Sequence, residues 1–198
     1  MQSIDPYVEL AKAAIRAYVE SGDIFELSKS LADGCGGGAA SLPRGPDYSL
    51  LFGERAGAFV SIKKDGALRG CIGTISPTQA SLAEEIVYNA ISACSRDPRF
   101  PPVRQSELSR LTVSVDVLSE ATPVKSAAEL DVLRYGVIVS KGYRRGLLLP
   151  NLEGVDTVES QLAIALGKAG ISPSEKYSIE RFEVIRHEAG GSMRPEPS

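Results

Sequence analysis

Two strand-like segments joined by an Asp-Gly dipeptide constrain the fold of this chain more than any other feature of its sequence. The segments cover residues 56–62 and 67–74, and Asp65-Gly66 lies between them. Asp-Gly readily supplies the positive φ angles of a type I′ turn, whose twist matches that of two antiparallel strands. The sequence therefore predicts a β-hairpin at this point and antiparallel pairing in the sheet that contains it.

Helices and further strands alternate along the rest of the chain. Apolar spacing predicts a helix over residues 5–22, and capping residues begin two more, at Ser81 with Glu84 and at Asp156 with Glu159. Strands are expected at residues 111–117, 137–140, 146–149 and 178–186, with a short helical turn at 126–130. This order predicts an α+β fold, in which helices cover a mostly antiparallel sheet.

Composition and charge are those of an ordinary globular protein. The chain has 198 residues, 43% of them hydrophobic and 24% charged, which suffices for one domain with a smaller appended lobe. The formal net charge of −3 gives no electrostatic reason to expect general affinity for nucleic acid. Because no run of about 18 apolar residues and no signal-peptide pattern is present, we expect a cytoplasmic protein without a membrane segment.

The cysteines, the single histidine and one glycine-rich stretch bear on cofactors. Cys35, Cys71 and Cys94 are odd in number and widely spaced, which favours free thiols over a disulfide framework. His187 is the only histidine and there is no C-x-x-C pair, so no metal site is expected. Residues 34–39 superficially match a dinucleotide fingerprint, but they neither follow a predicted strand nor precede a helix. The sequence therefore indicates no particular cofactor.

Two segments have too few apolar residues for packed structure. Residues 33–47 are rich in glycine and proline, and we expect a flexible loop there. Residues 188–198 have a similar composition and are expected to form a disordered tail. The folded domain is therefore expected within residues 5–187.

The second strand of the predicted hairpin carries the sequence LRGCIG. In a regular strand, Arg69 and Cys71 would share one face, while Leu68, Gly70 and Ile72 would share the other. A neighbouring cation favours the thiolate form of a cysteine, and glycines let a ligand approach the backbone closely. Cys71 is therefore a candidate nucleophile, with Gly70 and the following Gly73 in a candidate binding surface. A small buried side chain is the alternative interpretation of the cysteine.

Two further residue groups are candidates for binding an anion. The planar guanidinium of Arg69 suits a carboxylate or a phosphate, although an internal ion pair with Asp97 or Asp116 would also explain it. Residues 95–102 form a proline-rich loop in which Asp97 and Arg99 could line an anion site. Alternatively, the prolines only end the preceding helix, and Asp97 pairs with an adjacent arginine.

The densest basic cluster consists of Lys141, Arg144 and Arg145, at the turn of a predicted hairpin. A solvated turn is the simplest interpretation, and binding of RNA or an acidic partner is the alternative. His187 could serve Cys71 as a base only if the fold brought the two together.

Four segments of the chain resemble the AMMECR1 family: residues 57–64, 68–74, 97–102 and 149–159. The resemblance extends over residues 5–187. It implies an α+β fold with a larger and a smaller subdomain, and LRGCIG at a cleft between them. It also implies a place in the system called AmmeMemoRadiSam, as its protein A, beside a MEMO-like protein and a radical SAM protein. These partners suggest a role in modifying RNA or another macromolecule.

Three functions follow as hypotheses. In the first, a small anionic ligand or macromolecular substrate binds at LRGCIG through Arg69, Gly70, Gly73, Asp97 and Arg99. In the second, the same surface is a non-catalytic protein–protein interaction module. In the third, Cys71 is the catalytic thiol of an enzyme.

Overall fold

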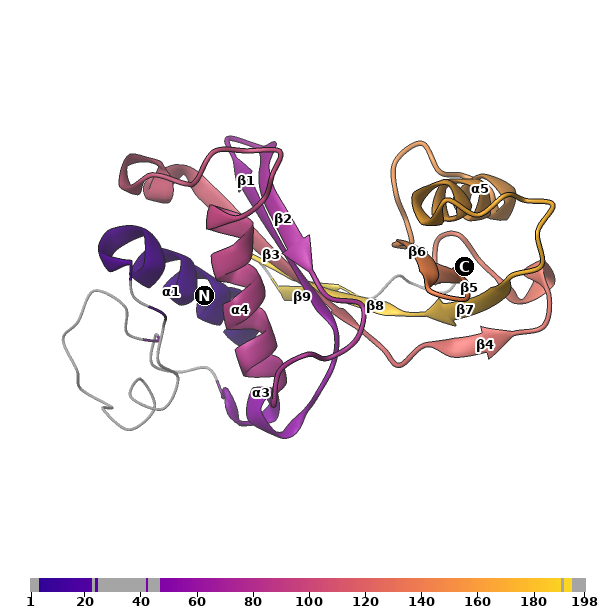
Figure 1. Cartoon of the computed structure of the whole chain (residues 1–198). Helices are drawn as coiled ribbons and strands as arrows, with labels where there is room; N and C mark the ends of the chain where they lie inside the picture. Colours follow the sequence, from indigo (N-terminus) through magenta and orange to yellow (C-terminus); the bar gives the residue numbers. More distant parts are fainter. Residues whose placement is uncertain (1–3, 23, 25–41, 43–46, 190, 194–198) are drawn as a thin grey trace. The chain divides into compact units, whose positions relative to one another are not determined.

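The computed structural model describes residues 4–22, 24, 42, 47–189 and 191–193, and these residues fall into two compact units (Figure 1). The first unit contains the described residues up to Val117 together with Arg186–Met193. The second contains Leu118–Ile185. Each unit has its own sheet with helical cover, and the predicted α+β class is confirmed.

The first unit is built on a five-stranded sheet with the order β2-β1-β3-β8-β9. Its strands are β1 (Ala58–Lys64), β2 (Ala67–Gly73), β3 (Leu111–Leu118), β8 (Val184–Glu188) and β9 (Gly191–Met193). Its helices are α1 (Pro6–Ser21), α3 (Ser49–Gly53), α4 (Leu82–Ser95) and the 3-10 helix η1 (Gln105–Arg110). The pairings of β1 with β2 and with β3 are antiparallel, as the hairpin predicted.

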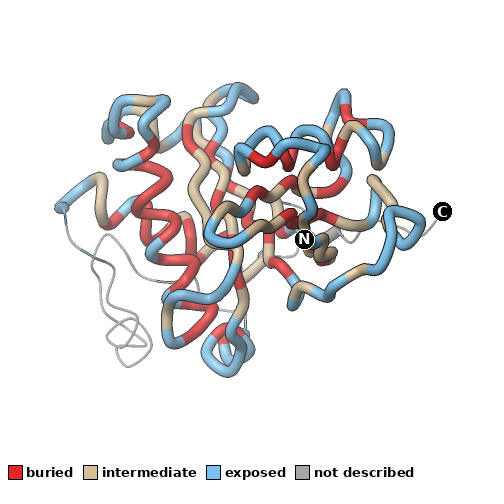
Figure 2. The backbone as a smooth tube through the Cα atoms, turned by 45° about the vertical axis from the view of Figure 1, so that its right-hand side comes forward, coloured by how far each residue is buried: buried red, intermediate tan, exposed pale blue. Residues whose placement is uncertain are grey.

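Helices α1 and α4 lie on the same side of this sheet (Figure 1). Val60 and Ile62 alternate along β1 and are fully buried in the core to which α4 contributes Leu82, Ile86 and other apolar residues. Most residues of α4 are buried and are coloured red in Figure 2. We call the side of the sheet turned toward α4 the inner face and the opposite side the outer face.

The predicted turn is present, but β2 is not a regular strand. Asp65 and Gly66 have φ angles of 49° and 84°, as a type I′ turn requires. Pairing shifts between Ile62 and Lys63, because Ile62 lies opposite Gly70 whereas Lys63 lies opposite Leu68. Arg69 is therefore the extra residue of a β-bulge, and the alternation of side chains is interrupted there.

The bulge directs Arg69 to the inner side of the sheet edge. Its Nε and Nη2 donate to the two carboxylate oxygens of Glu107 on η1, at 3.1 and 3.0 Å. Its Nη1 and Nη2 donate to the carbonyl oxygens of Pro101 and Pro102, at 2.8 and 3.2 Å. Lys64 Nζ forms an ion pair with the same carboxylate, 2.8 Å from Glu107 Oε1. The hydrogen bonds from Arg69, followed by those from Lys64, lower the pKa of Glu107 to about 2.

Gly70 lies directly beneath α4. A Cβ at this position would collide with the backbone carbonyl oxygen of Ala93. The missing side chain therefore allows the strand and the helix to approach each other closely.

Helix α1 begins and ends as predicted. The Asp5 carboxylate accepts the backbone N–H groups of Tyr7 and Val8 at 2.9 and 3.2 Å, and Gly22 closes the helix with a φ of 79°. At the start of α4, Ser81 accepts the N–H of Glu84 at 3.3 Å. The Glu84 carboxylate accepts the N–H of Ala80 instead of that of Ser81, so only half of the predicted capping box forms.

The second unit has a four-stranded antiparallel sheet with the order β4-β7-β5-β6. Its elements are β4 (Thr122–Val124), η2 (Ala127–Glu129), β5 (Gly136–Lys141), β6 (Arg144–Leu148), α5 (Val158–Ala169) and β7 (Ser178–Phe182). Val137 and Val139 of β5 pack with Leu162, Ala165 and Leu166 of α5 in a separate core.

Two predictions about secondary structure need correction. The strand expected at 178–186 is two strands, β7 and β8, which belong to different sheets. Between them, the backbone of Glu183 bonds to Ser119: its N–H donates to Ser119 Oγ and its carbonyl accepts the Ser119 N–H, both at 2.9 Å. Helix α5 is capped by Thr157, which accepts the Ser160 N–H at 3.1 Å, and not by Asp156.

The two segments expected to lack packed structure differ in how far the structure describes them. Within 188–198, Glu188 ends β8 and Gly191–Met193 form β9, which pairs with β8. Part of the expected tail is therefore a strand, because its backbone pairs with that of β8. Of the loop expected at 33–47, only Leu42 and Asp47 are described, so Cys35 and the rest of this segment lie outside the described residues.

Two glycine substitutions should change stability in opposite directions. Gly70→Ala should lower the free energy of unfolding by about 1–3 kcal/mol, because the new methyl group must displace α4 backbone. Gly167→Ala should raise it by about 0.5–1 kcal/mol, because that position is helical and a Cβ there meets no described atom. Urea unfolding at pH 7 measures both, and equal effects would contradict the proposed packing of Gly70.

The pKa of Glu107 predicts an acid-dependent contribution to stability. A carboxyl group with a lowered pKa stabilises the folded state fully above its ordinary value of 4.5, and this contribution is lost as the pH falls toward about 2. Glu107→Gln should therefore destabilise the protein at pH 7, and the deficit relative to the parent should shrink between pH 5 and pH 3. Chemical unfolding across this range tests it. The control is Glu159→Gln, which removes an exposed helical carboxylate without a described ion pair, and a deficit independent of pH would refute the prediction.

Candidate functional site

The outer face of the first sheet carries a row of three small polar side chains. Ser61 of β1 lies directly opposite Cys71 of β2 on one side and Ser114 of β3 on the other. Directly opposed residues share a face, and Ser61 alternates with the buried Val60 and Ile62. Cys71, Ser61 and Ser114 therefore lie side by side on the outer face, and we call them the polar row.

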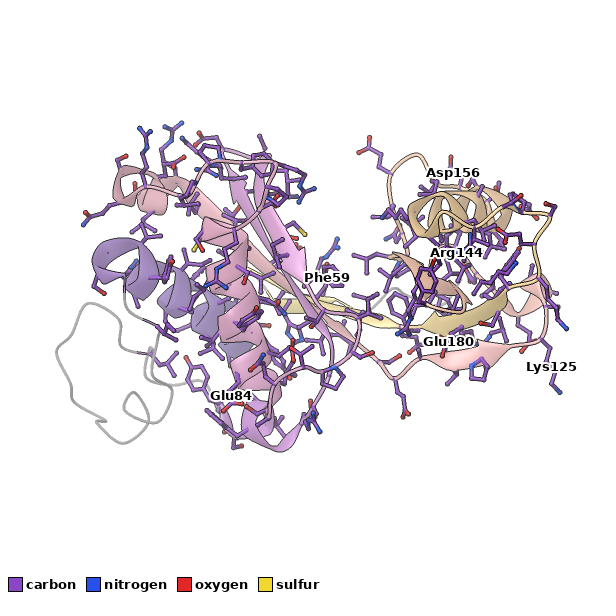
Figure 3. The ribbon with its side chains drawn as sticks, viewed as in Figure 1. Phe59, Glu84, Lys125, Arg144, Asp156 and Glu180 are labelled. Carbon is purple, nitrogen blue, oxygen red and sulfur yellow. The ribbon has the colours of Figure 1, made fainter. Side chains whose placement is uncertain are left out.

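The polar row lies between two larger side chains of β1. Phe59 precedes Ser61 by two positions, and Lys63 follows it by two, so both share the outer face. Figure 3 shows Phe59 on the side of the sheet away from α4. The row is thus bounded by an aromatic ring at one side and an exposed ammonium group at the other.

Cys71 is partly exposed, and both its side chain and its backbone are held in place. The Ser61 hydroxyl donates to Cys71 Sγ at 3.2 Å. Strand β2 is at the edge of the sheet, and its neighbour on the open side is the loop after α4. From that loop, Asp97 Oδ2 accepts the Cys71 N–H at 2.8 Å, and Arg99 Nη2 donates to the Cys71 carbonyl oxygen at 3.1 Å.

Asp97 and Arg99 form the first of two similar ion pairs. Arg99 Nε and Nη2 donate to Asp97 Oδ1 and Oδ2 at 2.9 and 2.7 Å. The Asp97 side chain is 3% exposed, whereas that of Arg99 is 54% exposed. The hydrogen bond from Arg99 is the main reason that the pKa of Asp97 lies well below its usual value. The carboxylate is thus ionised at neutral pH and fixes the orientation of a guanidinium that faces solvent.

Asp116 and Arg186 form the second pair. Arg186 Nε and Nη2 donate to Asp116 Oδ1 and Oδ2 at 2.7 and 2.9 Å. Here too the carboxylate is 3% exposed and the arginine side chain 45% exposed. The hydrogen bonds that the arginines donate to the aspartates contribute most to the raised pKa of Arg99 and of Arg186, and the Cys71 side chain is a smaller cause in both. Asp116 lies directly opposite Phe59, so this pair is on the outer face, two positions along β3 from Ser114 of the polar row.

Arg186 was missed by the sequence analysis, and Asp116 was considered only as a partner of Arg69. Asp116 alternates with the apolar Val115 and Val117, so the pattern placed it on a polar face without indicating a partner. Arg186 is 70 positions away in the chain. No spacing in the sequence connects the two, and only the pairing of β3 with β8 brings them together.

Arg69 does not share a face with Cys71. It forms an internal ion pair, which was the alternative interpretation of this residue. The partner is Glu107, and not Asp97 or Asp116 as expected. Its side chain is only 12% exposed, and Nε, Nη1 and Nη2 all donate to protein acceptors. Arg69 is therefore a poor candidate for a free anion anchor, and the alternation predicted for LRGCIG is wrong because of the bulge.

The two glycines expected to line a binding surface are explained by packing. Gly70 makes room for α4, as described above. At Gly73, which lies opposite Phe59, a Cβ would collide with the Phe59 ring. The close approaches that these glycines permit are made by the protein itself.

His187 is not placed to act on Cys71. Its Nδ1 lies 2.9 Å from Asp5 Oδ2, and its ring stacks on Tyr7 with centroids 3.6 Å apart. Burial raises the pKa of Asp5, but the hydrogen bond and charge of His187 and the backbone N–H groups of Val8 and Tyr7 lower it, and the net shift is downward. The histidine thus ties β8 to the start of α1, on the inner face.

Each cation of the basic cluster in the second unit has a carboxylate partner. Lys141 and Arg144 both bond to Glu175, at 2.5 and 2.8 Å. Arg145 lies 3.4 Å from Glu180. Figure 3 shows Arg144 and Glu180 in this unit. The cluster is therefore largely neutralised, which weakens the case for RNA binding through these three residues.

The described residues form neither a cluster of metal ligands nor a membrane-spanning helix. No group of three or more His, Cys, Asp or Glu side chains among them could hold a metal ion. None of the helices they form is long and apolar enough to cross a membrane.

Comparison with known proteins identifies the family. The AMMECR1 family model matches residues 8–187. A protein of Thermotoga maritima is 50% identical over 184 residues, which are 92% of this chain and 97% of that protein. A protein of Clostridium acetobutylicum is 47% identical over 188 residues, but this chain spans only 36% of its length. The crystal structure of an uncharacterised protein from Pyrococcus horikoshii superposes with a TM-score of 0.76 at 30% identity, covering 97% of this chain and 95% of that one. This chain belongs to the AMMECR1 family.

Proposed function

We propose that the first unit binds a small anionic ligand on the outer face of its sheet, over Cys71, with Arg99 as the cation that holds it. The observation that carries this proposal is the orientation of Arg99. The nearly buried Asp97 holds its Nε and Nη2, while about half of the side chain is exposed beside Cys71. Arg99 replaces Arg69, the anchor expected from the sequence, because Arg69 is already bonded to Glu107.

The Asp97 carboxylate does not cancel the ability of Arg99 to bind an anion. Its two oxygens already accept four N–H groups, from Arg99 Nε and Nη2 and from the backbones of Arg99 and Cys71. Arg99 Nη1 donates to none of the described residues, so it is available to an oxygen of a ligand. A guanidinium held in this way loses little conformational freedom when an anion binds.

Alkylation of Cys71 tests anion binding without knowledge of the natural ligand. Iodoacetate is anionic and iodoacetamide is neutral, and both react with the same thiolate. The ratio of their rates at Cys71 therefore reports on attraction of the anion and is independent of thiol ionisation. Arg99→Gln should lower this ratio by about fivefold, the effect of one partly exposed ionic contact. The rates are followed by mass spectrometry of the Cys71 peptide, because Cys35 and Cys94 also carry thiols.

Arg96→Gln is the matched control. It removes the same charge three positions away, from an exposed side chain without a described ion pair. Its ratio should stay within about twofold of the parent, as expected for a screened surface charge. If Arg99→Gln and Arg96→Gln give the same ratio, Arg99 does not hold an anion at Cys71, and the proposal fails.

A thiol-dependent enzyme is the second candidate, and the hydrogen bond from Ser61 favours it. The Ser61 hydroxyl fixes the position of the Cys71 sulfur atom, which is partly exposed and therefore able to act as a nucleophile. Ser61→Ala should then slow the reaction of Cys71 with iodoacetamide at pH 7 while leaving the iodoacetate-to-iodoacetamide ratio unchanged. An unchanged iodoacetamide rate would leave Cys71 as a neighbour of the ligand, without a nucleophilic role.

An interaction module within a modification system is the remaining alternative. The partners to test are the MEMO-like and radical SAM proteins that the family resemblance suggested. Protection of Cys71 from iodoacetamide by a stoichiometric partner protein, with the rate ratio unaffected by Arg99→Gln, would favour this alternative over ligand binding.

A further inference from the structure

The Asp116–Arg186 pair has the same hydrogen-bonding geometry as the Asp97–Arg99 pair and belongs to the same face of the sheet. In each pair, a carboxylate that is 3% exposed holds Nε and Nη2 of an arginine whose side chain is about half exposed. Like Arg99, Arg186 has an Nη1 that donates to none of the described residues. A ligand with a single anionic group, bound at Arg99, would leave Nη1 of Arg186 without an acceptor.

We infer that the ligand of the outer face carries two anionic groups, one bound by Arg99 and the other by Arg186, with the rest of the molecule lying over the polar row. This inference rests on the proposed function, because it names the class of ligand that the same site accepts. The class is a short molecule with two carboxylate, phosphate or comparable groups.

The positions of the two pairs in the sheet support this ligand class. Arg99 bonds to Cys71 on the edge strand β2, and Arg186 bonds to Asp116 on β3, two strands further into the sheet. Strands lie about 4.8 Å apart, so the polar row from Cys71 to Ser114 spans about 10 Å. Arg99 donates to the backbone of Cys71 at one end of the row, and Arg186 bonds to Asp116, two positions along β3 from Ser114 at the other end. The two guanidinium groups therefore lie near opposite ends of the row, within reach of one short molecule.

The side chains between the two arginines fit the connecting part of such a molecule. Cys71, Ser61 and Ser114 are small, and none of them is fully buried, so a ligand can approach the sheet there. The serine hydroxyls supply hydrogen bonds, and the Phe59 ring supplies an apolar surface beside them. Lys63 is a third cation on this face, but it is exposed and no carboxylate orients it among the described residues.

Disulfide exchange at Cys71 measures these preferences without the natural ligand. Three probes are symmetrical disulfides of N-(mercaptoacetyl)glutamate, N-(mercaptoacetyl)glutamine and N-methylmercaptoacetamide. The Cys71 thiolate attacks one sulfur, the probe S–S bond breaks, and one probe thiolate leaves, so one disulfide replaces another. At equilibrium with a fixed excess of 2-mercaptoethanol, the labelled fraction of the Cys71 peptide gives the relative stability of each adduct.

The probes separate the first anion from the second. The glutamine probe has one carboxylate, together with a side-chain amide that the uncharged methylamide probe lacks. The fall in their ratio on Arg99→Gln therefore tests the proposed function. The glutamate and glutamine probes have nearly the same shape and differ by the second carboxylate. We expect the glutamate adduct to be about fivefold more stable than the glutamine adduct, as one partly exposed ionic contact would produce.

Variants test whether Arg186 causes the preference for the glutamate adduct over the glutamine adduct. Arg186→Gln should reduce the glutamate-to-glutamine ratio to about one and leave the glutamine-to-methylamide ratio unchanged. Because this variant leaves Asp116 buried without its partner, the double variant Asp116→Asn/Arg186→Gln serves as a neutral replacement, and a thermal melt confirms that each protein is folded. Lys63→Gln is the control for an exposed cation on the same face and should leave both ratios unchanged.

The outcomes distinguish failure of this inference from failure of the proposed function. Equal stability of the glutamate and glutamine adducts, with both more stable than the methylamide adduct, means that the site holds a single anion and overturns the inference alone. A glutamate preference that survives loss of Arg186 but disappears in Lys63→Gln also overturns it. If the methylamide adduct is as stable as the other two, neither anion is recognised and both proposals fail.

Discussion

The Asp97 carboxylate is the contact on which the rest of the candidate site depends. Strand β2 lies at the edge of its sheet, where unpaired backbone groups would otherwise be open to another strand. Asp97 accepts the outward N–H of Cys71, and Arg99, which Asp97 orients, donates to the Cys71 carbonyl. One nearly buried carboxylate thus closes the edge of the sheet, fixes the backbone of the cysteine and positions a guanidinium beside its thiol.

The two most distinctive segments of the sequence form one interlocked structure. Within LRGCIG, the backbone of Cys71 bonds to the side chains of Asp97 and Arg99. In the other direction, Arg69 donates to the carbonyl oxygens of Pro101 and Pro102. Arg69 also bonds to Glu107, and Gly70 lies against α4. Much of this pair of motifs therefore serves to attach the loop after α4 to the edge strand.

The residues left for binding are those whose side chains are oriented but still partly exposed. Cys71, Arg99 and Arg186 meet this description, whereas Arg69, Gly70 and Gly73 are occupied by contacts within the protein. The distinction rests on burial and partners. A guanidinium with three protein acceptors and little exposure contributes to folding, and one with a free nitrogen facing solvent can bind a ligand. The chain uses the same residue type for both purposes within 31 positions of sequence, from Arg69 to Arg99.

The sequence by itself determined the features that depend on neighbouring residues. Asp65-Gly66 specified the hairpin, alternation in residues 111–117 specified a strand with one buried face, and Asp5 and Gly22 marked the ends of α1. Only the tertiary structure decided which arginine pairs with which carboxylate, because the partners lie between 2 and 70 positions apart and several acids could satisfy each cation. It also decided that Arg69 and Cys71 point to different faces, since the bulge arises from how β2 pairs with β1 and leaves no mark in the local pattern. Local turn and capping chemistry can be read from the chain, whereas strand register and ion pairing depend on segments that meet only after folding.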